Sequence, residues 1–525
     1  GNVLLDLVGD LCSSYWAMAC AFARCDACFG REPSAPSNGN KVMSQLLDLN
    51  VWIVLPEVIV SVMAFIFLIV SVVMPEKRVK NLTFSLTIST LLLAAISVVA
   101  AWSYDSVSGL YGLAIQDRVS DITKLAICLI TPTVLIYGRS YLEKRSLLSG
   151  ELLTLMLLAT VGLMVMVSST HLITIYIGIE LMSLCLYALI ALYRDSVEAT
   201  ESAMKYFVLG ALASGILLYG MSLLYGLTGS LELAVIQKSV VVMERQELPV
   251  VIALILVIVG LLFKLGVAPF HMWVPDVYQG SPTSVTLFIA SAPKLAAFAM
   301  AMRLLVDGLQ PLLNDWQGML IILSILSMAT GNIIAISQTN IKRMLAYSTI
   351  AHVGYLLLGL LSGTPSGYAG SMFYVITYAL MSMGAFGMVI LLGRKGFESD
   401  ELVHFKGLSE RSPWFAFIML ILMFSMAGVP PFLGFWGKWF VLKELVDAGF
   451  VWLAVTAVIF SIIGAYYYIH VIKLMYFDKA DSMTAVKTSK QMHFALSING
   501  LALLILGLMP NALLAICVSV LSISV

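Results

Sequence analysis

PVVIALILVIVGLLFKLGVAPF, residues 249–270, carries the two features that decide the fold. The stretch is apolar apart from Lys264, and it is long enough to cross a bilayer core of about 30 Å as a helix. Its second feature is Gly266-Val-Ala-Pro-Phe270, where glycine and proline interrupt the backbone hydrogen bonds of a helix. We therefore expect a broken transmembrane helix that carries a lysine inside the membrane.

Similar apolar stretches recur along the whole chain. Of its 525 residues, 60% are hydrophobic and 11% are charged, against about 25% charged in a soluble protein. This composition excludes a soluble enzyme, and 30 basic against 30 acidic residues leave no excess charge for binding nucleic acid. We expect an all-α polytopic membrane protein, embedded in a lipid bilayer, with about 14 transmembrane helices. Their expected ranges are 51–74, 82–102, 119–138, 151–169, 172–192, 201–227, 249–270, 283–305, 316–337, 343–362, 369–393, 413–446, 451–477 and 494–520.

A second interruption, Gly428-Val-Pro-Pro-Phe432, lies in the twelfth expected helix and resembles the one in the seventh. Because the two helices are an odd number of positions apart, they enter the membrane from opposite sides. Interrupted helices at matching positions of two inverted halves are typical of ion pathways. We expect two inverted five-helix repeats, about 151–305 and 316–477, with broken helices 7 and 12. The alternative is that the prolines only kink packed helices.

Composition and charge also predict the domain boundaries and the orientation. Residues 1–42 lack the basic start of a signal peptide and become rich in Ser, Pro, Asn and Gly, so we expect a leader of doubtful function there. The transmembrane domain is expected to occupy residues 43–525. Lys and Arg lie mainly in connections that follow odd-numbered helices, which places those connections in the cytoplasm and both termini outside.

Several ionisable residues fall inside the expected helices. A lysine at the bilayer centre costs roughly 2.5–3.5 kcal/mol, so such residues are functional candidates. At about 1.5 Å per residue, Glu180, Lys264 and Lys294 lie near the membrane midplane. Lys438 follows the second interruption and is also expected to be deep. Lys124 lies near a helix end, where we expect it to snorkel to the surface.

Lys205 is expected about one turn inside the sixth helix, four residues after Glu201. It is either the partner of Glu201 in an i,i+4 ion pair or a functional partner of Glu180. For the deeper charges the alternative is a static ion-pair network, but such pairs rarely stabilise more than apolar packing does. Burial favours the neutral form of a lysine and a nearby carboxylate favours the charged form, so these residues are suited to proton exchange. Their similar depth predicts a row along the membrane plane.

Among the histidines, only His352 is expected well inside a helix. It could relay protons, or it could be a buried histidine with satisfied hydrogen bonds. The sequence supports no paired haem ligands, nucleotide-binding loop or metal cluster, so we expect no cofactor and no metal in this chain.

Three motifs resemble a known family: Phe263–Gly280, Gln338–Ser348 and Gly428–Lys438. Together they closely resemble the antiporter-like membrane subunits of respiratory complex I, NADH:quinone oxidoreductase, and the resemblance covers about residues 47–520. It implies fourteen helices, two inverted repeats, and proton translocation driven by quinone reduction elsewhere in the complex. By position it implies that proton translocation involves Glu180, Lys205, Lys264, Lys294 and Lys438.

Within this family the chain resembles the subunit N branch, the counterpart of mitochondrial subunit 2. Subunit M has a glutamate where this chain has Lys438, and subunit L continues into a long lateral helix. The resemblance implies a translocase that uses NADH, FMN, iron–sulfur clusters and quinone, with no redox centre in this chain. It also implies subunits M and K as neighbours, in a bacterial inner membrane.

Two other functions remain open at this point. Subunits of Mrp-type sodium/proton antiporters share the Gly-Val-Pro-Pro and Gln-Thr-x-x-Lys-Arg motifs and also keep a helix 12 lysine. Against them, Val274–Pro282 resembles the respiratory version. The third possibility is a passive scaffold, in which the deep charges only fix helix packing.

Overall fold

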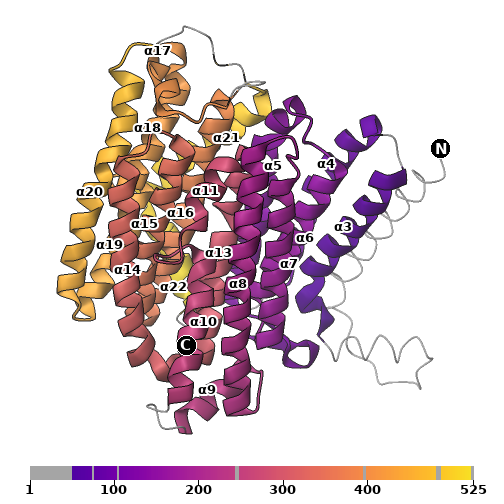
Figure 1. The fold of residues 1–525 in the computed structure, drawn as a ribbon, viewed down its shortest axis with the longest axis vertical. Helices are drawn as coiled ribbons and strands as arrows, with labels where there is room; N and C mark the ends of the chain where they lie inside the picture. The colour runs from indigo at the N-terminus through magenta and orange to yellow at the C-terminus, as the bar shows by residue number, and fades with distance from the viewer. Residues whose placement is uncertain are drawn as a thin grey trace, which may run out of the picture.

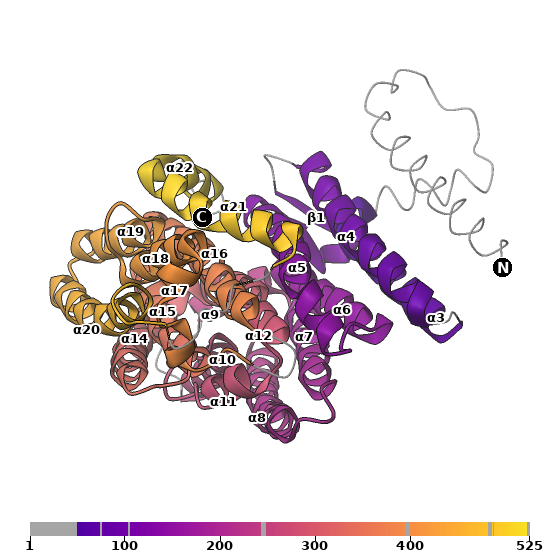
Figure 2. The same ribbon diagram turned by 90° about the horizontal axis from the view of Figure 1, so that it is seen from above.

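The computed structural model describes residues 50–73, 76–102, 106–242, 248–393, 398–480, 486 and 488–521. The expected leader, 1–42, lies outside these residues. Within them the chain is predominantly helical, and the long helices stand side by side (Figure 1). Seen from above, α3 and α4 form one end of the molecule, and α19 and α20 form the other (Figure 2). The predicted all-α membrane fold is confirmed.

Among the described residues, 13 helices are long and apolar enough to cross a membrane. The two halves of a broken helix, α18 (Pro413–Ala427) and α19 (Leu433–Asp447), together form a fourteenth membrane span. Each half has 15 residues and is therefore too short to cross a membrane alone. The expected number of about 14 agrees with this arrangement. The long helices are α3 (Leu55–Val73), α4 (Glu76–Ala100), α5 (Arg118–Lys144), α6 (Gly150–Val167), α7 (Leu172–Ala191), α8 (Val197–Thr228), α10 (Leu248–Leu265), α12 (Thr283–Ile289) with α13 (Ala292–Ala301) and a π-helical turn (Met302–Gly308), α14 (Leu313–Ile336), α15 (Ile341–Leu361), α16 (Pro365–Leu392), α20 (Val451–Tyr476) and α21 (Lys490–Leu508).

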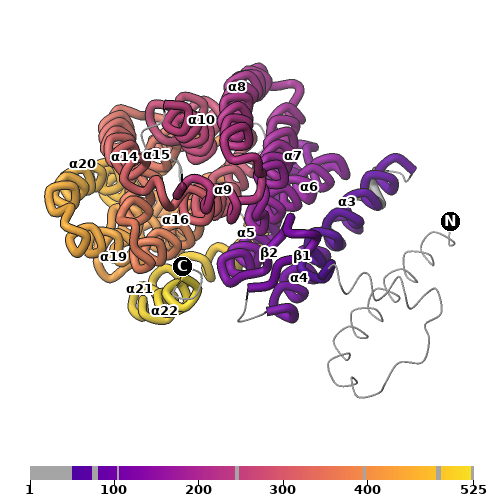
Figure 3. Tube along the Cα trace, turned by 90° about the horizontal axis from the view of Figure 1, so that it is seen from below, coloured from indigo at the N-terminus to yellow at the C-terminus, as the bar shows by residue number. Residues whose placement is uncertain are grey.

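Several short elements lie between these helices. On the face seen in Figure 3, two short strands and α9 lie near one another, and backbone pairings join Ala114 to Ser169 and His171 to Glu232. The expectation of one helix over 494–520 was wrong, because Pro510 has no N–H with which to continue α21 and instead begins α22. The short elements are β1 (Val107–Gly109), β2 (Ala114–Gln116), α9 (Leu233–Val242), α11 (Trp273–Gly280), α17 (Leu408–Arg411), α22 (Pro510–Leu521) and single turns at Val51–Val54, Leu110–Gly112, Gln310–Leu312 and Leu402–Phe405.

Both interruptions expected from the sequence are breaks between helices. Gly266 (φ +81°) ends α10 and Gly428 (φ +85°) ends α18, each in the left-handed region that favours glycine. In each case the glycine N–H donates to the carbonyls three and four residues before it. In Figure 1, α11 lies above α10 whereas α19 lies below α18, so the two broken helices run in opposite directions.

The best-buried helices lie at the centre of the bundle. The most apolar window of Thr283–Gly308 is 100% buried and that of Ile341–Leu361 is 94% buried, against 33% for Val451–Tyr476. The first two segments therefore have protein on all sides, and the third is covered on one side only. This arrangement places Lys294 and His352 in the interior.

Candidate functional site

Lys264 lies in the last turn of α10 and is enclosed by α7 and α8. Its Nζ donates hydrogen bonds to the hydroxyls of Ser183 (2.9 Å) and Ser214 (3.1 Å), and the residue is 8% exposed. The charge of Glu180 acts on Lys264, although no ion pair within 4.0 Å joins them. Oε1 of Glu180 is buried and has no hydrogen-bond partner among the described residues. Glu180 and Lys264 are thus electrostatic neighbours without a direct contact.

Lys294 lies in the first turn of α13 and reaches the first helix break. Its Nζ donates to the backbone carbonyl of Leu265 (2.8 Å) and lies 5.2 Å from the centre of the Trp273 ring. Leu265 is the last residue of α10, so the break leaves its carbonyl without a partner inside the helix. The partial negative charge at a helix C-terminus also attracts an ammonium group. The break at Gly266 therefore provides the acceptor that holds this lysine.

Lys438 makes the corresponding contact at the second break. Its Nζ donates to the carbonyls of Met426 (3.3 Å) and Ala427 (3.0 Å), the last residues of α18, and to the Ser461 hydroxyl (2.9 Å). The ammonium also lies 5.0 Å from the centre of the Tyr355 ring. The first half of each broken helix thus ends against a buried lysine.

His352 lies on α15, and both of its ring nitrogens are engaged. Nδ1 is 2.7 Å from the Tyr374 hydroxyl and Nε2 is 3.0 Å from the Tyr468 hydroxyl. The charge of Lys438 acts on the ring, and the Tyr378 ring lies 5.4 Å from it. Both readings of His352 offered by the sequence, a relay and a satisfied buried histidine, are compatible with this geometry.

Hydroxyl groups of α16 lie between α13 and His352. Ser382 donates to the carbonyl of Ala290 (3.2 Å), just before α13 begins. One turn earlier on α16, the Tyr378 hydroxyl is 2.8 Å from that of Thr349 on α15. Polar groups therefore continue from the neighbourhood of Lys294 to that of His352.

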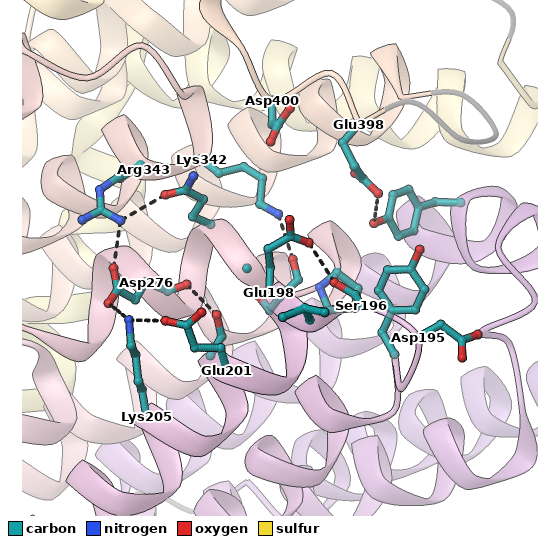
Figure 4. Close-up of a pocket in the computed structure, with 18 residues that line it drawn as sticks. Asp195, Ser196, Glu198, Glu201, Lys205, Asp276, Lys342, Arg343, Glu398 and Asp400 are labelled. Atoms are coloured by element: carbon teal, nitrogen blue, oxygen red, sulfur yellow. Dashed lines mark hydrogen bonds and ion pairs between the residues drawn. The ribbon is translucent and has the colours of Figure 1, made fainter.

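Lys205 lies apart from these buried residues. Its Nζ pairs with Glu201 and with Asp276, both at 2.8 Å, and its side chain is 45% exposed. Arg343 also pairs with Asp276 (2.8 Å), and Figure 4 shows this network at the rim of a cavity. The i,i+4 ion pair considered from the sequence is thus present, and no contact brings Lys205 to Glu180.

The expectation that Lys124 snorkels to the surface was wrong. Lys124 is buried, and its Nζ lies 2.6 Å from Oε1 of Glu57 on α3. Sequence reasoning missed Glu57, although a carboxylate within the apolar range 51–74 was a usable signal. Pairing on a neighbouring helix removes the need for the lysine to reach water, and α3 is not adjacent to α5 in sequence.

A second buried ion-pair network was also missed. Arg303 pairs with both carboxylate oxygens of Asp117 (2.7 and 2.8 Å) and with Asp307 (2.9 Å), and it donates to the Val167 carbonyl (3.1 Å). Burial raises the pKa of Asp117, but the charge of Arg303 and hydrogen bonds from Arg303 and Ser120 outweigh it and hold the pKa below its ordinary value. The Arg303 guanidinium and the Asp117 carboxylate therefore each have an oppositely charged partner, as expected of an ion pair with a structural role.

No group of three or more His, Cys, Asp or Glu side chains could hold a metal ion within the part of the chain that the structure describes. The arrangement therefore offers titratable amines, hydroxyls and an imidazole, whose common chemistry is proton transfer.

Comparison with known proteins identifies the family. A family model described as "NADH:quinone oxidoreductase/Mrp antiporter, TM" matches residues 169–464. The chain is 52% identical over 470 residues to the NADH-quinone oxidoreductase subunit N of Thioalkalivibrio sulfidiphilus, which covers 89% of this chain and 98% of that protein. The chain belongs to the NADH-quinone oxidoreductase subunit N family. The resemblance drawn from the three motifs is confirmed.

Solved structures agree with membership of the subunit N family. A chain in respiratory complex I from Thermus thermophilus with bound Aureothin has a TM-score of 0.76 and 33% identity, covering 88% of this chain and 99% of that one. A chain of the Mrp complex from Dietzia sp. DQ12-45-1b has the same TM-score, 0.76, at 20% identity, with coverage of 90% and 97%. The likeness to the Mrp complex shows a shared fold alone.

Proposed function

We propose that this chain is a proton-translocating membrane-arm subunit of an NADH:quinone oxidoreductase, coupled to quinone reduction elsewhere in the complex. Its buried row would consist of Glu180, Lys264, Lys294 and Lys438, with His352 as a relay between the last two. Family membership supports the complex, and the geometry of the buried lysines supports the translocation.

One observation carries the proposal. Among the described residues, Lys264, Lys294 and Lys438 have no carboxylate within 4.0 Å, whereas buried Lys124 pairs with one carboxylate and buried Arg303 with two. A buried ammonium without a paired anion is costly, and the neutral amine avoids that cost. The three lysines are therefore well placed to release and regain a proton.

The partners of Lys264 suit both of its protonation states. The hydroxyls of Ser183 and Ser214 accept hydrogen bonds from an ammonium and can donate one to a neutral amine. In the proposed cycle Glu180 modulates Lys264 by its charge, Lys294 passes the proton across the interior, and Lys438 is the terminal site before release. Lys205 would take part in proton translocation at the surface of the protein.

The proposal extends to the surroundings of the chain. The complex would use NADH, FMN, iron–sulfur clusters and quinone, none of them held here, and subunits M and K would be neighbours. We place the chain in a bacterial inner membrane with both termini periplasmic. We also propose that residues of about 151–305 and 316–477 form two inverted repeats, which the matched helix breaks support. The transmembrane domain would extend from residue 43 to residue 525.

The test is Lys264→Ala in membrane vesicles that contain the assembled complex. We expect a lower proton-to-electron ratio during NADH oxidation, with Lys443→Ala, a substitution of an exposed lysine on α19, as the matched control. If assembly and activity fall together while the ratio is unchanged, the chain is a scaffold and the proposal is wrong.

Native isolation separates the respiratory complex from a sodium/proton antiporter. Co-purifying subunits with flavin and iron–sulfur absorbance support the proposal. Colourless membrane partners would instead support an Mrp-type antiporter, whose subunits share the fold.

A further inference from the structure

A cavity of about 650 Å³ opens beside the α7–α8 and α11–α12 connections, on the face expected to be cytoplasmic (Figure 4). Its lining carries more carboxylates than cations, which attracts positive charge. The cations are Lys205, Lys342 and Arg343. The carboxylates are Asp195, Glu198, Glu201, Asp276, Glu398 and Asp400.

Lys342 is the buried cation of this cavity. It is 3% exposed, and its Nζ donates to the backbone carbonyl of Ser281 (2.8 Å). The charges of Glu398, Asp400 and Glu198 attract its ammonium and that of Arg145 repels it, but no described carboxylate lies within 4.0 Å of Nζ. Lys342 thus shares the property that singles out the buried row, a buried amine held by a neutral acceptor.

Hydroxyl groups lead inward from Lys342. Thr349 follows it by two helical turns on the same face of α15, about 10 Å along the axis, and His352 lies one turn further. Tyr278 of α11, which packs against α15, is fully buried. Its hydroxyl lies beside the side chains of Thr349 and Tyr378, but no hydrogen bond of ordinary geometry joins it to another described residue. A buried hydroxyl without a partner is unusual and calls for an explanation.

We propose that this cavity is a proton entrance, and that Lys342 and the Tyr278 hydroxyl carry protons from it toward Thr349 and His352. The inference rests on the proposed function. In each transfer the Lys342 ammonium gives one proton, by way of cavity water, to the Tyr278 oxygen, whose own proton passes to Thr349 or Tyr378, and the neutral amine is then reprotonated from the cavity. Each hydroxyl gains one proton and loses one, so the chain of groups returns to its starting state. Protons would join the interior at His352, beyond Lys264 and Lys294.

Tyr278→Phe and Lys342→Arg test the entrance in vesicles that contain the assembled complex. Phe keeps the ring and removes only the hydroxyl, and Arg keeps the charge but does not release its proton. We expect both variants to assemble and to lose NADH-driven proton translocation. Lys342→His, which can exchange protons, should recover part of it.

Tyr137→Phe is the matched control, because Tyr137 is equally buried and its hydroxyl donates to the Ala495 carbonyl, away from the cavity. If Tyr278→Phe and Lys342→Arg translocate protons as fast per assembled complex as Tyr137→Phe does, the entrance is refuted. Lys294→Ala measured alongside separates the two hypotheses. If Lys294→Ala loses proton translocation while Lys342→Arg translocates protons normally, only the proposed entrance is refuted. If Lys294→Ala translocates protons normally, the proposed function itself is refuted.

Discussion

The ammonium of Lys294 is hydrogen-bonded to the carbonyl oxygen of Leu265, the residue at which α10 ends. A continuous helix would have used that carbonyl for its own backbone. The helix break therefore supplies the hydrogen-bond acceptor that allows Lys294 to be buried, and a substitution at the break should alter the surroundings of Lys294.

Gly266→Ala should destabilise the complex and disturb Lys294. A Cβ there would lie 2.7 Å from Cγ2 of Val274 and 3.5 Å from Nζ of Lys294, and an alanine at positive φ costs about 1–2 kcal/mol. We expect a lower thermal midpoint of the purified complex and slower proton translocation. Gly215→Ala, a helical glycine with nothing within 4 Å of the added Cβ, should leave both unchanged. Equal behaviour of the two variants would contradict this account of the break.

Glu180→Gln should slow NADH-driven proton translocation by about tenfold, equivalent to about 1.4 kcal/mol in the activation free energy of transport, because the charge of Glu180 no longer acts on Lys264. Gln keeps the shape and removes the charge, so assembly should be normal. The control is Glu151→Gln, an exposed glutamate in the first turn of α6. Translocation rates are compared per assembled complex, and equal rates would show that the charge of Glu180 does not act on transport.

Lys124→Met should destabilise the protein by about 3–5 kcal/mol, because it leaves Glu57 charged, buried and unpaired. Adding Glu57→Leu should restore most of this loss, since both charges are then absent. The proton-to-electron ratio of assembled complexes should be normal in the double variant. A lowered proton-to-electron ratio in the double variant would show that Lys124 and Glu57 take part in proton transport and do not only stabilise the fold.

Asp117→Asn should cost less, about 1.5–3 kcal/mol, because Arg303 loses one buried charged partner but keeps Asp307. Asp447→Asn removes an exposed i,i+4 pair with Lys443 and should cost about 0.3–0.5 kcal/mol. Thermal unfolding of the two variants in the same detergent compares them. Because the pKa of Asp117 is held low, its stabilisation is present at neutral pH and is lost only as the pH falls through that value.

Sequence patterns predicted the features that depend on one segment at a time. Apolar length predicted the helices, and the Gly-Pro motifs predicted the positions of both breaks. Burial of Lys264 and Lys294 followed from their distance to the ends of the expected membrane spans, because a residue near the middle of a span has no short path to water, and burial of Lys438 followed from its place just after the second interruption.

Pairings between segments were not predictable in the same way. Lys124 and Glu57 lie on α5 and α3, and only the packing of those helices shows that they meet. The same holds for the ion pair of Arg303 with Asp117 and for the ion pair of Lys205 with Asp276. Each of these contacts depends on tertiary packing, whereas depth in a helix depends on local sequence alone.

The opposite directions of the two broken helices have an electrical consequence. α10 and α18 each end inside the molecule with a partial negative charge facing a lysine, but one dipole points up the molecule and the other points down. A transmembrane voltage pushes the two dipoles in opposite senses, so its effects on them largely cancel. The two ammonium groups carry the same charge, so a voltage that presses one lysine toward its carbonyl draws the other lysine away from its own.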